Sequence, residues 1–144
     1  MKAPHRVLGG LTIMRVLEMV TPFKWQHFFP ETTAEDWAPH RQWLEPDALD
    51  PDTDQLQFPM QSYVVRTSHH TILIDSCVGN NKDRPTRPHW HLKTDQTYLN
   101  ALAAHGIAPE AIDFVMCTHL HSDHVGWNTR LENGRWVPTF PNAR

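Results

Sequence analysis

The stretch THLHSDHVGWN, residues 118–128, is the part of the sequence that decides the fold. Residues 114–117 before it form a short continuous apolar run, which is typical of a buried strand. Open α/β sheets bind their ligands at the edge where such strands end. The stretch itself holds three histidines and an aspartate within six positions: His119, His121, Asp123 and His124. The sequence therefore predicts an α/β fold with a functional site at this strand end.

These four residues carry the ligand atoms that zinc prefers, imidazole nitrogen and carboxylate oxygen. In an extended chain His119 and His121 project to the same side. Asp123 and His124 follow where the chain must turn, so the four side chains do not easily surround one tetrahedral ion. They suit two ions about 3.5–4 Å apart, with a water between them that loses a proton near neutral pH. Accidental clustering remains the alternative.

The surrounding sequence predicts strands and one clear helix. In chain order, the predicted elements are strands at 11–20, 63–66 and 71–74, a helix at 94–105 and a buried strand at 114–117. Thr94 is the predicted N-cap of the helix, and Gly106 is placed to end it. Asp75 ends an apolar strand and needs partners, because burying a bare carboxylate is costly. Asn133-Gly134 predicts a tight hairpin turn.

Residues 21–59 differ in composition from the rest of the chain. They contain six prolines, which exclude a long regular helix or strand there. A short helix capped by Asp36 is expected at about 37–44. The rest is expected to be an extended aromatic loop. It is either a lid or an interaction surface, or its rings simply pack onto the domain.

Composition limits the function classes. The chain has 144 residues, 40% hydrophobic content and a net charge of −3, as in ordinary soluble globular proteins. No basic stripe favours nucleic acid, although a metal-dependent nuclease is not excluded. No signal peptide or membrane span is seen, so we expect a cytoplasmic protein. Cys77 and Cys117 are expected to be buried free thiols.

The motif H-W-H, His89 to His91, lies in a polar loop at residues 80–93. Two histidines two positions apart can bind a metal from an extended chain. Without a nearby carboxylate we interpret the loop as solvated. His69 and His70, at the predicted turn between strands 63–66 and 71–74, are expected to be exposed.

THLHSDHVGWN closely resembles the HxHxDH signature of the metallo-β-lactamase fold hydrolases. TILIDSCVGNN, residues 71–81, resembles the strand of that family that ends in an aspartate and a glycine turn. The resemblance covers residues 63–128 and, more loosely, 11–20. It implies an α/β (α+β) fold, the αββα sandwich, of which this chain supplies about the N-terminal half. Residues 1–144 would then be one partial domain with a Pro/Trp-rich insertion at about 21–59.

The resemblance also assigns roles to residues. His119 and His121 resemble ligands of the first metal, and Asp123 and His124 ligands of the second. Asp123 is also placed to orient the nucleophilic water or to shuttle its proton, as the catalytic residue. Asp75 resembles a supporting aspartate that holds the metal loop by hydrogen bonds. Two Zn²⁺ ions are implied for the complete fold, with Mn²⁺ or Fe²⁺ as alternatives.

The sequence departs from the family after the signature. It contains no histidine after His124 and no aspartate after Asp123, whereas the family completes its metal shells with a third histidine, a bridging aspartate and a last histidine. We therefore expect a truncated metal-dependent hydrolase of a small ester or lactone, with weak or no activity alone. The alternative is a non-catalytic module that retains half a site and binds a metal or forms a homodimer. A redox di-iron protein is disfavoured.

Overall fold

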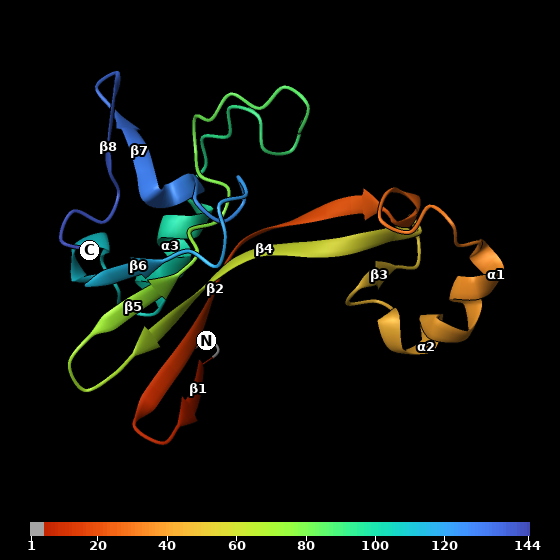
Figure 1. Ribbon diagram of the computed structural model, residues 1–144, viewed down its shortest axis with the longest axis horizontal. Helices are drawn as coiled ribbons and strands as arrows, with labels where there is room; N and C mark the ends of the chain where they lie inside the picture. The colour runs from red at the N-terminus through yellow and green to blue at the C-terminus, as the bar shows by residue number, and fades with distance from the viewer. Residues whose placement is uncertain (1–4) are drawn as a thin grey trace. The chain divides into compact units, whose positions relative to one another are not determined.

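The computed structural model describes residues 5–144 and consists of two compact units (Figure 1). Unit 1 comprises Met1–Met19 and Met60–Arg144, and unit 2 comprises Val20–Pro59. Each unit has its own hydrophobic cluster. The elements mix strands and helices and are dominated by a sheet, which confirms the predicted fold class.

The main sheet has the strand order β1-β2-β4-β5-β6. These strands span His5–Leu8, Leu11–Lys24, Gln55–Arg66, Thr71–Ile74 and Phe114–Met116, and β3 (Leu49–Asp50) pairs with β4. β1 and β2 are antiparallel, as are β4 and β5, whereas β5 and β6 run parallel with Leu73 opposite Val115. A parallel pair needs a crossover connection, and the helix α3 (Thr97–Ala104) lies within it.

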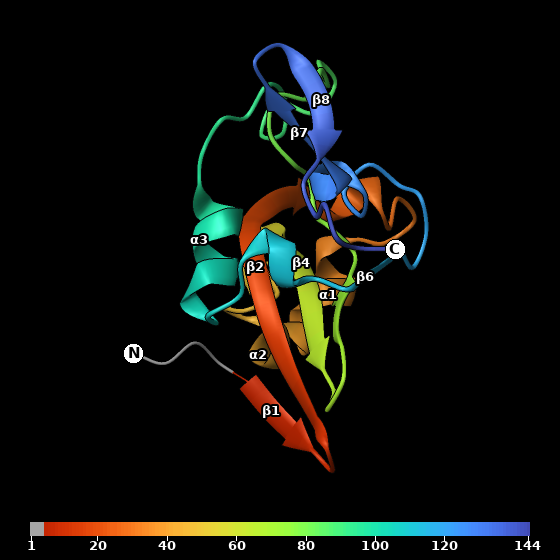
Figure 2. The same ribbon diagram turned by 90° about the vertical axis from the view of Figure 1, so that its left-hand side faces the viewer.

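Alternation along the strands places the core of unit 1 on one face of the sheet. On β2, Met14 and Val16 are buried while Arg15 between them is exposed. Tyr98 and Leu102 of α3 pack against this face. Figure 2 shows α3 beside β2. One sheet face covered by one amphipathic helix therefore makes the core of unit 1.

The helix is shorter than predicted at its N-terminus. It begins at Thr97, and its N-cap Gln96 makes no side-chain cap, so the predicted cap at Thr94 is wrong. Asp95 takes over that role in part, because its Oδ1 accepts the Thr97 N–H at 2.9 Å. The helix ends as predicted, with Gly106 in the left-handed region at φ 69°.

The strand at 114–117 was expected to be buried, and this is wrong. β6 is the last strand in the order of the described sheet, and Met116 is 58% exposed. Cys117 next to it is half-buried rather than buried, whereas Cys77 is fully buried as predicted; both are free thiols. The predicted hairpin is confirmed: β7 (Thr129–Glu132) and β8 (Arg135–Pro138) pair around a two-residue turn.

Unit 2 is more regular than the expected loop. β2 continues to Lys24 and β4 already starts at Gln55, so two strands reach into it. Between them lie η1 (Trp25–His27), α1 (Ala34–Trp37), η2 (Ala38–His40) and α2 (Arg41–Leu44). The expected cap at Asp36 is wrong, because Thr33 is the N-cap of α1. Asp36 occupies the third helical position, where its side chain accepts the backbone N–H of Thr33 and completes a capping box.

The aromatic side chains of unit 2 pack on one another. Trp25, Leu49 and Leu56 are its buried cluster, and the Trp25 and Trp37 rings lie 5.4 Å apart between centroids. The buried cluster explains how a proline-rich segment can be ordered with only short helices.

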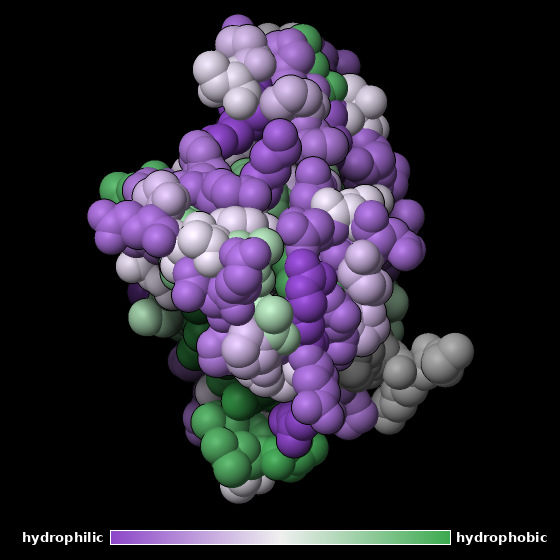
Figure 3. Space-filling model, turned by 90° about the vertical axis from the view of Figure 1, so that its right-hand side faces the viewer, coloured by the Kyte–Doolittle hydropathy of each residue, from purple (hydrophilic) through white to green (hydrophobic). Residues whose placement is uncertain are grey.

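Exposed apolar side chains gather at the turn of the β1–β2 hairpin in unit 1, seen as the green patch at the bottom of Figure 3. Val7, Leu8 and Leu11 form it. Among residues 5–144, no helix is both long and apolar enough to cross a membrane.

Candidate functional site

The predicted site residues lie in the segment that follows β6. We call residues 118–125 the histidine loop; they connect the sheet to η4 (Gly126–Asn128). Because β5 and β6 are parallel neighbours, their carboxyl ends meet at the same edge of the sheet. Asp75, directly after β5, therefore lies beside the start of the histidine loop.

Asp75 holds both ends of the histidine loop. Its Oδ1 accepts the backbone N–H of Thr118 at 2.8 Å, and its Oδ2 accepts the Thr118 hydroxyl at 2.9 Å. The same Oδ2 lies 2.9 Å from His124 Nδ1, which donates to it. The predicted need for partners at Asp75 is met by these contacts, and the ring orientation of His124 is fixed as a result.

The environment of Asp75 favours its charged form. Burial alone would raise the pKa of this carboxyl group, but the hydrogen bonds from His124 and Thr118 together outweigh burial and hold the pKa below its ordinary value. Asp75 is thus a carboxylate that orients its neighbours and has few free lone pairs for a metal.

The three histidines of the loop lie together. His119 Nε2 is 3.1 Å from His121 Nδ1, and their ring centroids are 4.6 Å apart. The His119 and His124 ring centroids are 3.9 Å apart. The structure therefore brings together His119 and His121, which the sequence spacing placed on one side, and adds the ring of His124 to them.

Asp123 also belongs to this cluster, which we call the histidine cluster: His119, His121, Asp123 and His124. Its Oδ2 lies 3.3 Å from His124 Nε2. His124 Nδ1 faces Asp75, so Nε2 is the ring nitrogen that faces Asp123. This nitrogen and the carboxylate oxygen are both atoms that can bind a metal ion.

The fit to a metal is partial. Two ligands bound to a tetrahedral zinc at about 2.0–2.1 Å lie about 3.3 Å apart, close to the 3.1 Å between His119 Nε2 and His121 Nδ1 and the 3.3 Å between His124 Nε2 and Asp123 Oδ2. Among residues 5–144, however, no group of three or more His, Cys, Asp or Glu side chains is arranged to hold one ion. The histidine cluster thus offers pairs of suitable donors and no complete shell.

Two buried or half-buried charged residues near the loop were not singled out from the sequence. The first is Glu18 of β2, whose Oε2 accepts the N–H of Val78 at 2.7 Å and whose Oε1 accepts the indole N–H of Trp127 at 2.8 Å. Lys93 Nζ lies 2.9 Å from the same carboxylate. The sequence signal that could have identified Glu18 was its position on the buried face of an alternating strand, because a carboxylate there needs partners.

The second is Arg84, in the loop 80–93. Its two terminal nitrogens donate to the carbonyl oxygens of Val78 and Ser122, each at 2.8 Å. Burial lowers the pKa of Arg84 from its ordinary value, and the nearby carboxylates of Glu18 and Asp123 offset part of this effect. No sequence pattern pointed to it, because the contact joins segments 38 positions apart.

Trp127, just after the histidine loop, anchors the end of that loop in the core. It is buried, and its ring stacks on that of Tyr98 with centroids 5.3 Å apart. His69, His70, His89 and His91 are all exposed, as expected. The premise that no carboxylate lies near the H-W-H motif is wrong, because Asp83 Oδ1 is 3.4 Å from His91 Nδ1.

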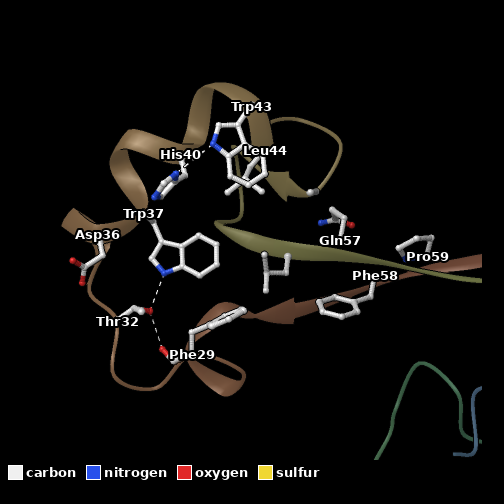
Figure 4. A pocket seen from close by; sticks show the side chains of 12 residues that line it. Phe29, Thr32, Asp36, Trp37, His40, Trp43, Leu44, Gln57, Phe58 and Pro59 are labelled. Carbon is white, nitrogen blue, oxygen red and sulfur yellow. Dashed lines mark hydrogen bonds between the residues drawn. The ribbon is translucent and has the colours of Figure 1, made fainter. Parts of the chain in front are cut away.

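A separate cavity of about 620 Å³ lies within unit 2 (Figure 4). Trp37, Trp43 and Phe58 form much of its apolar wall, and no member of the histidine cluster lines it. The Trp37 indole N–H donates to Thr32 Oγ1 and that of Trp43 to His40 Nδ1, so both indole donors are satisfied inside the unit. This cavity is apolar and offers no metal-ligand cluster.

Comparison with known proteins gives a family and a fold. The sequence model of the metallo-beta-lactamase superfamily matches residues 57–144. No curated protein sequence matches the chain. The chain is similar to the structure of a probable metal-dependent hydrolase from Staphylococcus aureus, with a TM-score of 0.71, 21% identity and coverage of 96% of this chain and 47% of that one.

Two further solved structures are similar. One is the hydrolase AbOPH of the beta lactamase superfamily, with a TM-score of 0.65, 25% identity and coverage of 96% of this chain and 42% of that one. The other is AidC, a dizinc quorum-quenching lactonase in complex with a product, N-hexnoyl-L-homoserine, with a TM-score of 0.69, 19% identity and coverage of 97% and 42%. The chain therefore spans less than half the length of these solved structures.

Proposed function

The chain belongs to the metallo-beta-lactamase superfamily, and from this membership we propose that it is part of a metal-dependent hydrolase whose metal ligands include the histidine cluster. The observation that carries the proposal is the meeting of His119, His121 and His124 at the carboxyl end of β6, with Asp123 against His124. The ions proposed are two Zn²⁺, with Mn²⁺ or Fe²⁺ as alternatives.

In this proposal the residues of the chain have separate tasks. His119 and His121 bind the first ion, and Asp123 and His124 bind the second. Zinc at such a centre supplies an activated water at neutral pH and polarises the carbonyl oxygen of the substrate. Asp75 keeps the His124 ring in one tautomer, with Nε2 free for binding, through the 2.9 Å contact at Nδ1. Asp123 is the catalytic residue that orients the water or takes up its proton.

The proposed substrate is a small ester or lactone. The similarity to a lactonase solved with its product supports this class, as does the absence of a basic stripe in a chain with a net charge of −3. The histidine cluster supplies two residues for each of the two ions, whereas catalytic zinc normally takes three protein ligands. We therefore propose that these 144 residues alone have weak or no hydrolase activity.

The test is the metal content of the full-length protein that carries this sequence. We expect two ions per chain in the wild type and the loss of at least one in the His119→Ala, His121→Ala double variant, measured by mass spectrometry of bound metals after dialysis. His69→Ala with His89→Ala is the matched control, because both side chains are exposed and lie outside the histidine cluster. Unchanged metal content in the cluster variant contradicts the proposal.

A second candidate function is favoured by one observation. Because no group of three donors is arranged to hold an ion within residues 5–144, a non-catalytic metal-binding or dimerising module is the alternative. Such a module would bind one ion or none per chain, or one ion shared by two copies. The same metal measurement, combined with the molecular mass of the protein in solution, which gives its oligomeric state, distinguishes the two candidates.

A further inference from the structure

Arg84 connects the histidine loop to a fixed part of unit 1. Its guanidinium group donates one hydrogen bond to the carbonyl of Val78 and another to the carbonyl of Ser122, both at 2.8 Å. Ser122 stands between His121 and Asp123, one residue from each. The carbonyl that Arg84 contacts belongs to the planar peptide unit joining Ser122 to Asp123, so the contact fixes the orientation of that unit.

The Val78 end of this connection is rigidly held. The backbone N–H of Val78 donates to the buried carboxylate of Glu18 at 2.7 Å. Gly126 packs so closely on Val78 that an added Cβ would lie 1.9 Å from the Val78 carbonyl oxygen. A hydrogen bond from Arg84 to Val78 therefore places its guanidinium relative to the core and not relative to another surface loop.

The backbone of Arg84 is itself held by the H-W-H motif, which the proposed function does not use. The Arg84 N–H donates to His91 Nδ1 at 3.1 Å. The ends of the loop are joined by hydrogen bonds from Asn81 N to Lys93 O and from Leu92 N to Lys82 O, at 2.7 and 2.9 Å. The loop 80–93 is thus a closed structure that presents Arg84 at a defined place.

We propose that Arg84 is a positioning residue for the metal ligands: it sets the spacing of His121 and Asp123 by holding the carbonyl of Ser122 between them. This inference rests on the proposed function for its consequence in metal binding. Arginine suits the task because its planar guanidinium holds two donors in fixed geometry, which lysine does not.

The test compares Arg84→Met with Arg84→Lys in the full-length protein. Methionine removes both donors and the charge, whereas lysine keeps the charge and can satisfy one carbonyl. We expect Arg84→Met to weaken zinc affinity about tenfold to a hundredfold, the range typical for lost support of metal ligands, in competition with a chromophoric chelator. The visible spectrum of the Co²⁺-substituted protein should change as well, with Arg84→Lys between Arg84→Met and the wild type.

A second measurement does not need metal. In metal-free protein, we expect hydrogen–deuterium exchange of the hydrogen-bonded amides of Thr118 and His124 to rise about tenfold in Arg84→Met, since the charge-assisted hydrogen bond that holds the histidine loop is lost. Arg87→Met is the control, because the Arg87 side chain is exposed and its guanidinium lies over the Trp90 ring, 5.8 Å from the ring centroid, rather than against the histidine loop. Exchange should stay unchanged in the control, and thermal unfolding of all metal-free variants should stay close to wild type.

The outcomes separate the two proposals. Wild-type exchange and wild-type zinc affinity in Arg84→Met would overturn the role of Arg84, whatever the enzyme does. A wild-type protein that binds no metal would overturn the proposed function, and the exchange of the Thr118 and His124 amides would then decide the role of Arg84 alone.

Discussion

Asp75 receives hydrogen bonds from Thr118 and from His124, so a single carboxylate sets both the start of the histidine loop and its last ring. Its side chain is only 11% exposed, which makes these contacts strong compared with surface pairs. We predict that Asp75→Asn lowers the free energy of unfolding of the metal-free protein by about 1–3 kcal/mol at neutral pH. Denaturant titration measures this, with Asp47→Asn as the exposed control.

The same variant gives a pH dependence with a definite sign. The folded state holds the pKa of Asp75 below its ordinary value of 3.8, so the stability from its charge is complete above that pH and is lost as the pH falls through the lowered value. The difference in free energy of unfolding between wild type and Asp75→Asn should therefore be constant above about pH 5 and shrink in acid. An equal difference at acidic and neutral pH contradicts a stabilising role for the charge of Asp75.

At the scale of elements, two turns meet where Gly126 packs on Val78. An added Cβ at Gly126 would lie 1.9 Å from the Val78 carbonyl oxygen and 2.6 Å from that of Cys77, and both are backbone atoms that cannot move aside cheaply. We predict that Gly126→Ala lowers the free energy of unfolding by about 3 kcal/mol or more, as overpacking against backbone does.

Gly10→Ala is the matched control for this prediction. An added Cβ at Gly10 has no neighbouring atom within 4 Å, so we expect a change within about 0.5 kcal/mol. Chemical denaturation of both variants is the measurement. Equal stability of the two alanine variants would show that the contact between the turns is looser than described.

The elements themselves were predictable where one pattern dominated. Alternation predicted β2 from Leu11, and the apolar run of Thr71–Ile74 predicted β5. The continuation of β2 to Lys24 was missed, because Pro22 argued against a strand. The N-terminus of α3 was missed because Thr94 suits a cap by residue type, whereas the helix begins at Thr97, whose N–H is held by Asp95.

At the scale of the whole molecule, each unit has a separate cluster of buried side chains. Leu49 is fully buried in the cluster of unit 2 together with Trp25 and Leu56. We predict that Leu49→Ala destabilises unit 2 by about 2–5 kcal/mol through the cavity that it leaves. Hydrogen exchange should accelerate in residues 20–59 and stay near wild type in residues 60–144.

Leu8→Ala is the control for this experiment, because Leu8 is 68% exposed at the β1–β2 turn. It should change exchange in neither unit. If Leu49→Ala accelerated exchange in both units alike, the chain would unfold as one cooperative body. The two units, divided at Val20 and Pro59, would then not differ in stability.

By itself, the sequence determined the mixed α and β class, the family, and the placement of His119 and His121 on one side of the chain after a strand end. Spacing decides this placement, because alternate residues of an extended chain project to the same side. The fold then brought the His124 ring against that of His119. Only the tertiary structure decided that Arg84 contacts Ser122 and that Glu18 contacts Trp127. Those contacts join residues 38 and 109 positions apart, and no local pattern encodes a partner that arrives only when the sheet, the loop 80–93 and the turn at Gly126 pack together.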